Sequence, residues 1–472
     1  MSIFSKPYRA PLALLLTLTL LCSQLLYNVA PLQAAFTIKD EREYGQKMLA
    51  VIRSQFDLLD EPDISQYINS RGEDILKIAG NQYFQYHFYV IKDKEFNAFA
   101  APSGLIFMHS GLLEAMDNEG ELTSVLAHEV GHVTSRHIAG RLEQSTKISA
   151  ATLAMLLAGI AVGGGALSQA LITGGLATGQ AMSMAFSRKD EEEADRKGYQ
   201  YMLAMGYDPQ TMVEMLHKMY QVQQLNIGKV PQYMLTHPNP DIRMGYVQDL
   251  IHTSPPTLLR QHDDFAFQRL KCRVRSYTKE SLKLKALYQK KLRQAATPFN
   301  RAMARYGLAL AYGDEAQWQQ AEDELRQVIA FFPDKPILKT DLGVNFLRQG
   351  RVAEALVLLK EARDLDSNNW HTNYYLAQAL ESSGDDGRAL SLFEQVSGAM
   401  PDFPGAYYHM AAILSRQGHA GPAYFYLGKN FFYQGKFSTA RHHFAKAQKL
   451  IAADKVKMAE IREMRALMKE ID

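Results

Sequence analysis

The segment LAHEVGH, residues 126–132, places two histidines four positions apart and a glutamate directly after the first. An α-helix advances 3.6 residues per turn, so His128 and His132 would project from the same helix face. Two imidazoles on one face can bind one zinc ion, and Glu129 could reach a water molecule bound to that ion. The pattern therefore predicts a zinc site that catalyses hydrolysis, with Glu129 as the general base.

Residues 128–132, HEVGH, also fit an ordinary polar helix face. The pattern H-E-x-x-H arises by chance in about one chain in a hundred of this length. The prediction therefore depends on a third ligand, since catalytic zinc takes three protein ligands and keeps one position for water. Residues 187–195, SRKDEEEAD, offer Glu191 as that ligand and Asp195 one turn later. Asp195 would accept a proton from a ligand imidazole and fix its tautomer. The acidic cluster is also typical of a helix start stabilised by the macrodipole, and both readings can hold together.

A family resemblance rests on three segments in order: NAFAAPSG (97–104), LAHEVGHVTSRH (126–137) and SRKDEEEAD. Together they resemble the HtpX and CAAX-prenyl-protease type of zinc metallopeptidase, in which H-E-x-x-H is followed by E-x-x-x-D. Residue by residue, the resemblance implies one zinc ion per chain, the general base Glu129 and the supporting carboxylate Asp195. The implied zinc ligands are His128, His132 and Glu191.

The loop THPNPDIR, residues 236–243, supplies His237 and Arg243 as candidates for stabilising a developing oxyanion. The family pattern includes this His-Pro. His237 could instead occupy the fourth zinc position and block water. The alternatives are a surface-loop histidine and an ion pair at a helix start. His109 and His137 are interpreted as structural, the latter because it follows His132 by five residues and would lie off the metal-facing side.

The elements around these motifs follow from periodicity and turn signals. Residues 36–79 have a helical, amphipathic pattern, and residues 86–91 are rich in β-forming types. Residues 96–113 predict two short strands joined by a Pro-Ser-Gly turn and then a helix start. Asn118 and Glu121 predict the start of a helix over 119–139. The strand at Asn97, Ala98 and Phe99 could pair with an extended substrate backbone, and an ordinary meander strand is equally consistent.

A repeat with a period of 34 residues begins after Thr297. Large and small residues recur in register over four copies, which is the tetratricopeptide signature. A half-period shift from Leu427 to Ala447 predicts that the last helix of the fourth repeat also begins an extra hairpin. Such solenoids bind peptides or partner proteins on a concave face. One position of the repeat holds a large apolar residue in each copy: Leu308, Leu342, Leu376 and Met410. Another position holds alanine in each copy: Ala321, Ala355, Ala389 and Ala423.

The N-terminus has a basic stub, an apolar run at residues 10–26 and small residues at Ala34 and Ala35. This order predicts a secretory signal peptide cleaved near Ala34 or Ala35, and the apolar run is shorter than the ~20 residues of a spanning helix. An uncleaved membrane anchor is the alternative, and a lipid anchor at Cys22 is weaker because Leu21 precedes it. Cys272 then remains alone, so no internal disulfide is expected.

Two further stretches are unusual in charge. Residues 148–187 carry no charge until Arg188, and we expect them to form helices that cover the active-site cleft or contact a membrane; a transmembrane hairpin is the alternative. Residues 271–293 carry nine Lys or Arg against one acid, which favours the solvated face of a connecting helix over an anionic membrane contact. The overall net charge of +2 does not indicate nucleic acid as a partner.

The expected fold is mainly α: a zincin-like α+β metallopeptidase domain with a small sheet, followed by an α-solenoid. The expected boundaries are a signal peptide at 1–35, the peptidase domain at 36–255, a basic connecting helix at 256–296 and the repeats at 297–472. The resemblance implies a periplasmic zinc endopeptidase with a chaperone-like role in outer-membrane protein quality control. Its partners would be unfolded or misassembled proteins and, through the repeats, the outer-membrane assembly machinery. The alternative is a largely latent peptidase that serves as an adaptor.

Overall fold

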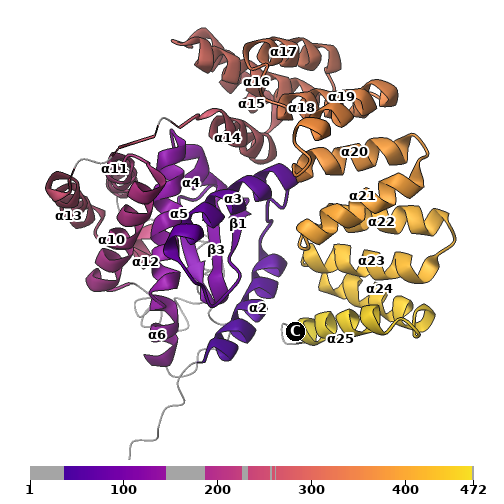
Figure 1. Ribbon diagram of the computed structural model, residues 1–472, viewed down its shortest axis with the longest axis horizontal. Coiled ribbons are helices and arrows are strands. Elements are labelled where there is room, and N and C mark those ends of the chain that lie inside the picture. The colour runs from indigo at the N-terminus through magenta and orange to yellow at the C-terminus, as the bar shows by residue number, and fades with distance from the viewer. Residues whose placement is uncertain (1–36, 145–185, 226–231, 256–257, 261, 470–472) are drawn as a thin grey trace, which may run out of the picture.

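The computed structural model describes residues 37–144, 186–225, 232–255, 258–260 and 262–469. Figure 1 shows a helical domain built around a small sheet and, beside it, an arc of paired helices that forms the C-terminal half. This arrangement confirms the expected fold class, an α+β domain followed by a helical solenoid. The described helices include none that is long and apolar enough to cross a membrane. The predicted signal peptide and the uncharged stretch at 148–185 lie outside the described residues.

The sheet has three strands in the order β1-β3-β2. Strand β1 (His87–Ile91) runs parallel to β3 (Leu105–His109), and β2 (Ala98–Ala101) runs antiparallel to it. The turn between β2 and β3 is the 3-10 segment η1 (Pro102–Gly104), in which Ser103 and Gly104 have φ of 70° and 79°. Glycine tolerates this left-handed backbone, so the Pro-Ser-Gly sequence suits the turn. The predicted strand at 86–91 and the predicted pair of strands are confirmed.

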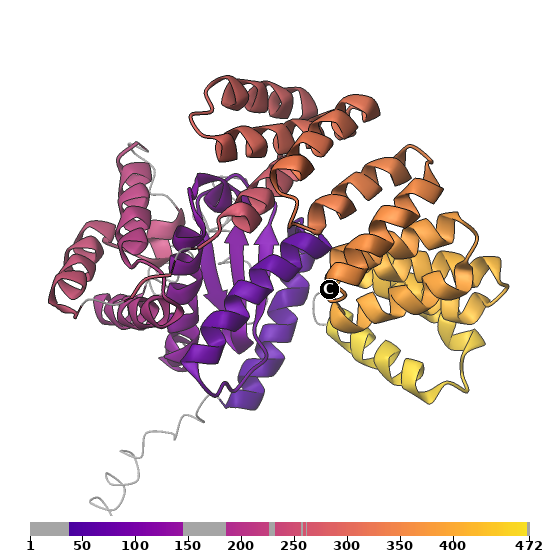
Figure 2. The ribbon, with the colours of Figure 1, turned by 45° about the horizontal axis from the view of Figure 1, so that its top comes forward.

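Helices cover both faces of the sheet (Figure 2). Alternate strand residues point to opposite faces, so Phe88 and Val90 pack with the large core around helices α3 (Pro62–Ala79) and α5 (Glu119–Thr134). Tyr89 and Ile91 pack on the other face with helix α2 (Ile38–Gln55). Helix α5 therefore lies against the sheet with nearly all of its residues buried.

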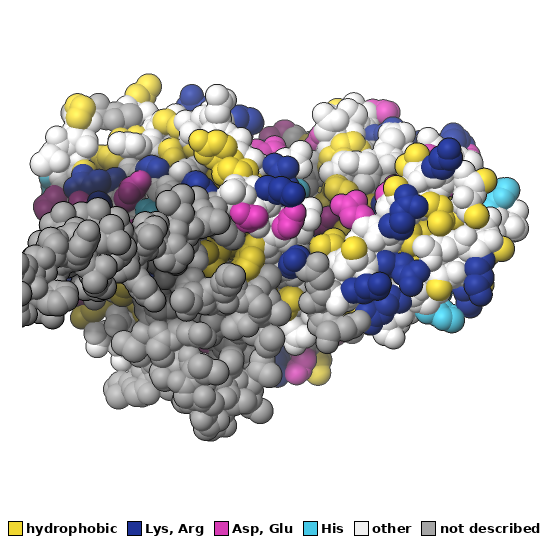
Figure 3. All heavy atoms as spheres, turned by 90° about the horizontal axis from the view of Figure 1, so that it is seen from below, with side chains coloured by type: hydrophobic (Ala, Val, Ile, Leu, Met, Phe, Trp, Pro, Cys, Tyr) yellow, Lys and Arg dark blue, Asp and Glu magenta, His cyan; other side chains and the backbone are white. Residues whose placement is uncertain are grey.

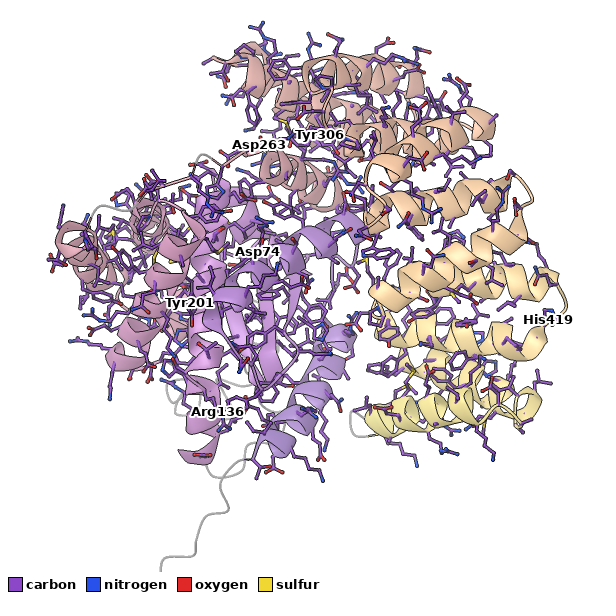
Figure 4. The ribbon with its side chains drawn as sticks, in the orientation of Figure 1. Asp74, Arg136, Tyr201, Asp263, Tyr306 and His419 are labelled. Atoms are coloured by element: carbon purple, nitrogen blue, oxygen red, sulfur yellow. The ribbon has the colours of Figure 1, made fainter. Side chains whose placement is uncertain are left out.

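The predicted single helix over 119–139 is wrong, because the chain turns between α5 and helix α6 (His137–Gln144). Arg136, labelled in Figure 4 near the lower end of the domain, has φ of 53° and breaks the helix. The left-handed residue interrupts the helix, so residues after 136 do not continue the helical wheel of α5.

The remaining helices of the first domain surround α5. They are α4 (Ser110–Ala115), α10 (Arg188–Met205), α11 (Gln210–Leu225), α12 (Gln232–Thr236) and α13 (Pro240–Thr253). Helix α10 packs closely on α5, because a Cβ added at Gly131 would lie only 2.8 Å from the backbone oxygen of Ala194. This close contact brings the two predicted ligand segments together.

The basic stretch after the first domain differs from its expected form. It contains two helices, α14 (Phe265–Thr278) and α15 (Ser281–Arg293), instead of one connecting helix. The charged residues Arg269, Lys271 and Arg273 of α14 are buried, so this part is not a solvated face. Helix α14 supplies apolar side chains to the core of the first domain, whereas α15 packs with the repeats.

The solenoid consists of antiparallel helix pairs, and its final helices confirm the half-period shift expected from Leu427. Small residues lie where paired helices cross: a Cβ at Gly343 would approach Leu359, and one at Gly428 would approach the ring of Phe444. The helices are α16 (Pro298–Asp314), α17 (Trp318–Phe331), α18 (Ile337–Arg348), α19 (Val352–Leu365), α20 (Trp370–Ser382), α21 (Asp386–Ala399), α22 (Pro404–Arg416), α23 (Ala420–Tyr433), α24 (Phe437–Leu450) and α25 (Lys455–Lys469).

A buried charge cluster joins α3, α14 and the repeats. Asp63 accepts hydrogen bonds from Arg269 Nη1 at 3.0 Å and from Arg273 Nε at 2.8 Å. Arg269 also donates two bonds to Asp341 of α18, at 2.9 and 2.6 Å. Tyr306 of α16, labelled in Figure 4, donates to the same carboxylate at 3.1 Å. The two halves of the protein are therefore joined by charged groups that lie out of contact with water.

A second contact joins α2 and the sheet to the end of the solenoid. Arg53 donates to Asp60 at 2.7 Å, to Asp402 at 3.0 Å and to the backbone oxygen of Tyr433 at 2.9 Å. Tyr89 of β1 also donates to Asp402, at 2.6 Å. The solenoid thus contacts the first domain at two separated places, which fixes its position relative to the sheet.

Candidate metal centre

Helices α5 and α10 carry the predicted site residues, and a cap fixes the residue at which each helix begins. The Asn118 side chain accepts the backbone N–H of Glu121 at 2.9 Å and begins α5. Ser187 and Asp190 form a reciprocal capping box at the start of α10. Helix α12 and the start of α13 then bring the loop with His237 and Arg243 against both helices.

Four side chains converge as a possible metal-binding set: His128, His132, Glu191 and His237, with one donor atom from each within 4.8 Å of the others. The Nε2 atoms of His128 and His132 are 3.0 Å apart, and Glu191 Oε1 is 3.3 Å from His132 Nε2. His237 Nδ1 lies 3.3 Å from His128 Nε2 and 3.0 Å from Glu191 Oε1. All four side chains are buried. The structure therefore brings together the three predicted ligands and the loop histidine.

Glu129 lies beside this set and is fully buried. Its Oε1 is 3.5 Å from His237 Nε2, and neither carboxylate oxygen has a hydrogen-bond partner among the described residues. A buried carboxylate without partners is costly, so both oxygens are available for a water molecule or substrate group. This is the environment that a general base requires.

Asp195 and Arg243 support the donor set from behind. Asp195 Oδ1 is 2.7 Å from His128 Nδ1, which leaves His128 Nε2 turned to the other donors. Arg243 donates to both oxygens of Asp195 at 2.8 Å and lies 2.8 Å from Glu191 Oε2. Burial alone would raise the pKa of both carboxyl groups, but Arg243 and the neighbouring histidines outweigh it and hold each pKa well below its usual range. Both carboxylates are therefore ionised.

His132 has two contacts that the sequence did not reveal. Burial lowers its pKa, so the ring is neutral, as a metal ligand must be. Its Nδ1 is 3.0 Å from His137 Nδ1, and Phe186 stacks on its ring at 3.9 Å between centroids. His137 is outside the metal-binding set, as expected, and contacts the His132 nitrogen opposite the one that faces the other donors.

His237 is held by aromatic rings as well as by its polar contacts. Tyr233 of α12 stacks on it, with ring centroids 4.5 Å apart and planes 20° apart. Phe186 lies 5.1 Å away on a tilted plane. Tyr233 is 1 % exposed, so this stacking occurs in the absence of bulk water. The stacking fixes Nδ1 toward the donor set and Nε2 toward Glu129.

The chemistry of the donors fits zinc. Three imidazole nitrogens and one carboxylate are ligands that zinc accepts in a four-coordinate site. His237 Nε2 and both carboxylate oxygens of Glu129 are buried and have no hydrogen-bond partner among the described residues. Partnerless polar atoms around a compact donor set are expected where an ion completes their contacts.

The predicted substrate strand lies at an edge of the sheet. Asn97 and Phe99 are buried, and β2 pairs with β3 alone within the described residues. Phe99 stacks on Phe107 inside the core. His109 is buried at the end of β3, and burial lowers its pKa to about 3, which agrees with a structural role.

Sequence reasoning missed Tyr233, Phe186 and Tyr246, the last of which donates a hydrogen bond to Asp195. Tyr246 follows Arg243 by three residues on α13, so helical spacing could have identified it once Arg243 was chosen. No comparable spacing relates Tyr233 or Phe186 to the motifs, since they contact the site only through the tertiary fold.

Comparisons with known proteins agree with this site. The family described as "Peptidase family M48" matches residues 62–251, and tetratricopeptide-repeat families match residues 306–369 and 346–414. The "Beta-barrel assembly-enhancing protease" of Escherichia coli (strain K12) is 30% identical over 340 residues, which cover 71% of this chain and 69% of that protein. The protein of the same name from Yersinia pestis is 29% identical over 388 residues, covering 82% and 79%.

A more distant relative matches less than half of the chain. The "Mitochondrial metalloendopeptidase OMA1" of Schizosaccharomyces pombe is 28% identical over 207 residues, which cover 44% of this chain and 56% of that protein. Each of these relatives is a protease or metalloendopeptidase by name. The extent of the match to the Escherichia coli protein and the family match over the metal centre together establish the family. The chain belongs to peptidase family M48 and is a metallopeptidase whose peptidase domain is followed by tetratricopeptide repeats.

Proposed function

We propose that this metallopeptidase is a zinc-dependent endopeptidase of the periplasm that acts in the quality control and assembly of outer-membrane proteins. The observation that carries the proposal is the compact set of His128, His132, Glu191 and His237 beside the partnerless carboxylate of Glu129. The names of the relatives support the link to β-barrel assembly, and the predicted signal peptide supports export. The proposed domain boundaries are those expected from the sequence.

We assign one zinc ion per chain to His128, His132 and Glu191, with His237 as a fourth ligand in the resting state. When bound, zinc supplies a Lewis acid that polarises a carbonyl group and lowers the pKa of water. Glu129 accepts the proton of the attacking water and later delivers it to the leaving amine. Asp195 holds the His128 tautomer, and Arg243 is a positioning residue that keeps Glu191 and Asp195 ionised and oriented.

Chelation tests the proposal directly. Incubation with a strong zinc chelator is expected to abolish cleavage of unfolded casein, and one equivalent of zinc is expected to restore it, because the donor set has no substitute for the ion. Peptide fragments are measured by mass spectrometry. Cleavage that survives complete metal removal would contradict the proposal.

Asp195→Asn is expected to weaken zinc binding between about 10-fold and 100-fold, because the substitution removes the charge that orients His128. The zinc dissociation constant is measured by competition with a chromophoric chelator. Glu192→Gln is the matched control, since Glu192 is on the same helix but, among the described residues, pairs with Arg196 alone, at the surface. Equal zinc affinity in wild type and the Asp195 variant would refute the supporting role.

His237 controls access in this proposal. His128, His132, Glu191 and His237 are at most 2 % exposed, so a substrate carbonyl cannot reach the donor set until a covering side chain moves. His237 comes from the short loop between α12 and α13, whereas the other three donors come from the long helices α5 and α10, so His237 can leave the donor set without displacing either helix. The closed site also favours the second candidate function, a largely latent peptidase that acts as an adaptor through its repeats.

His237→Ala is expected to raise casein cleavage about 10-fold or more. In wild type the open state, in which His237 has left the donor set, is the minor state and holds about 10% of the molecules at most. The variant would be open in every molecule. Tyr233→Leu is expected to raise cleavage as well by removing the stack, whereas Tyr233→Phe keeps the stack and is the matched control. Initial rates are measured with zinc in excess. A fall in rate for His237→Ala would instead assign His237 to stabilising the transition state.

Substrate binding is assigned to the edge strand. An extended substrate segment would pair through its backbone with Asn97, Ala98 and Phe99, along the edge of β2 that has no strand partner among the described residues. Such pairing selects unfolded chains with little sequence preference. The repeats are proposed to contact the assembly machinery and to provide the chaperone-like activity. Rescue of an outer-membrane assembly defect by the Glu129→Gln variant would assign the physiological role to the adaptor function, and failure of that rescue would assign it to hydrolysis.

A further inference from the structure

The C-terminal end of the solenoid, formed by α24 and α25, carries an unbalanced positive charge. Residues 436–472 contain nine Lys or Arg against five acids. Two of the acids are engaged, since Asp454 pairs with Lys457 at 2.6 Å and Glu460 with Lys429 at 3.0 Å. Figure 3 shows dark-blue side chains predominating over this end of the molecule. The excess charge is therefore at the surface.

Three of the five cations of α25 lie on one stripe. Lys455, Arg462 and Lys469 are seven residues apart, so they project from the same helix face, and all three are exposed. Ala459 and Ala466 lie between them on that face and are also exposed. Small residues between the cations allow a flat surface to approach the helix closely. No described carboxylate forms an ion pair with these three cations.

Exposed apolar side chains accompany the charge at the turn between α24 and α25. Leu450 is 58 % exposed and Val456 is 71 % exposed. Lys446, Lys449 and Lys455 flank them in the sequence and are exposed. Cations around protruding apolar side chains are typical of surfaces that insert into the headgroup region of an anionic bilayer. A soluble acidic partner would be matched by the cations alone and would not require the two apolar tips.

The position of this end in the molecule supports the same partner. In Figure 1, α25 lies at the lower edge together with α6 and the start of α2, and the turned view of Figure 2 keeps α25 and the start of α2 on that side. The longest stretch of sequence without charge, residues 148–187, follows α6 on this side. One side of the protein therefore combines the cationic stripe with the end of α6, from which the uncharged stretch continues.

We infer that the α24–α25 surface, defined by Lys446, Lys449, Leu450, Lys455, Val456, Arg462 and Lys469, binds an anionic phospholipid membrane. Membrane binding would place the end of the solenoid on the bilayer, together with the lower edge of the first domain as seen in Figure 1. The inference does not depend on hydrolysis, so it stands or falls separately from the proposed peptidase mechanism.

Sedimentation of the full chain with vesicles tests the inference. The protein is expected to bind more strongly to phosphatidylethanolamine vesicles with 30% phosphatidylglycerol than to pure phosphatidylcholine vesicles. Its binding to the anionic vesicles is expected to weaken as the salt concentration rises. The K455E/R462E/K469E variant is expected to partition about 100-fold less onto the anionic vesicles, because each lost cation costs about tenfold or less. The matched control is K283E/K290E/R293E, which makes the same charge change on the distant helix α15 and is expected to bind like wild type.

A second pair of measurements separates lipid from other polyanions. The L450S/V456S variant is expected to lose vesicle binding and to keep wild-type retention on a dextran sulfate column, because only the bilayer accepts apolar tips. Casein cleavage and circular dichroism confirm that each variant is folded. Wild-type vesicle binding by K455E/R462E/K469E would overturn the inference, and so would unchanged vesicle binding by L450S/V456S, which would indicate an acidic macromolecule instead.

Discussion

Glu129→Gln is expected to lower the rate of casein cleavage between about 100-fold and 10,000-fold, the range that a positioned general base contributes. Glutamine has nearly the same volume and shape as glutamate, so the fully buried site should keep its packing. Its amide cannot accept the proton of the attacking water. Because Glu129 is outside the ligand set, zinc content is expected to stay at one ion per chain. Single-turnover rates and metal content are measured on the same preparation.

The control for this variant is Glu192→Gln, which removes one carboxylate from the exposed face of α10 and should leave the rate unchanged. Loss of zinc from the Glu129 variant would show that the substitution disturbs the site as a whole. A rate for Glu129→Gln equal to that of wild type would contradict the assignment of the general base.

Asp63→Asn is expected to destabilise the protein by about 3–5 kcal/mol, because it leaves two buried guanidinium groups short of a counter-charge. Asp63 accepts from both Arg269 and Arg273, and all three side chains are buried. Asparagine keeps the volume but removes the charge, so the loss reflects electrostatics and not a cavity. The free energy of unfolding is measured by urea denaturation, followed by tryptophan fluorescence and by circular dichroism.

The control is Asp74→Asn on the same helix, where the carboxylate pairs with Arg71 and Lys77 near the surface and is expected to contribute about 1 kcal/mol or less. A loss for Asp63→Asn no larger than this would show that the buried cluster does not hold the two halves together. Since Asp63 contacts groups of both halves, its loss should also increase proteolysis between the domains.

The stability that Asp63 contributes also depends on pH. Burial alone would raise the pKa of this carboxyl, but Arg273, His371 and Arg269 outweigh it and hold the pKa well below its usual range. A carboxyl with a depressed folded-state pKa stabilises the protein above its unfolded pKa of about 3.9 and loses that contribution as the pH falls below it. Between about pH 5 and pH 3, a range of about two units around the unfolded-state pKa, wild type should therefore lose more stability than Asp63→Asn.

Local sequence patterns predicted the parts of the fold that depend on neighbours in the chain. The Pro-Ser-Gly turn, the capped starts of α5 and α10 and the 34-residue repeat are of this kind, since each rests on backbone preference or short-range packing. The spacing of His128 and His132 and of Glu191 and Asp195 placed each pair on one helix face. The contact between the two faces became visible only in the structure, where Gly131 lets α10 approach α5.

The interpretations that failed depend on contacts distant in sequence or on a single dihedral angle. Arg136 adopts a left-handed conformation that nothing in the residue type demands, and it ends α5 before His137, which then contacts the outer nitrogen of His132. The basic stretch was expected to be solvated because cations usually are. Asp63 and Asp341, distant in sequence, neutralise Arg269 and Arg273 instead. Charge composition alone does not contain this pairing.

The central claim is that one zinc ion is bound by His128, His132 and Glu191, with His237 as the fourth ligand at rest. The most direct test is an anomalous difference map from crystals of the purified protein, recorded on both sides of the zinc absorption edge. The expected result is one peak per chain between these four side chains, with Glu129 beside it and outside the ligand distance. A peak elsewhere, or no peak in protein that cleaves casein, would contradict the claim.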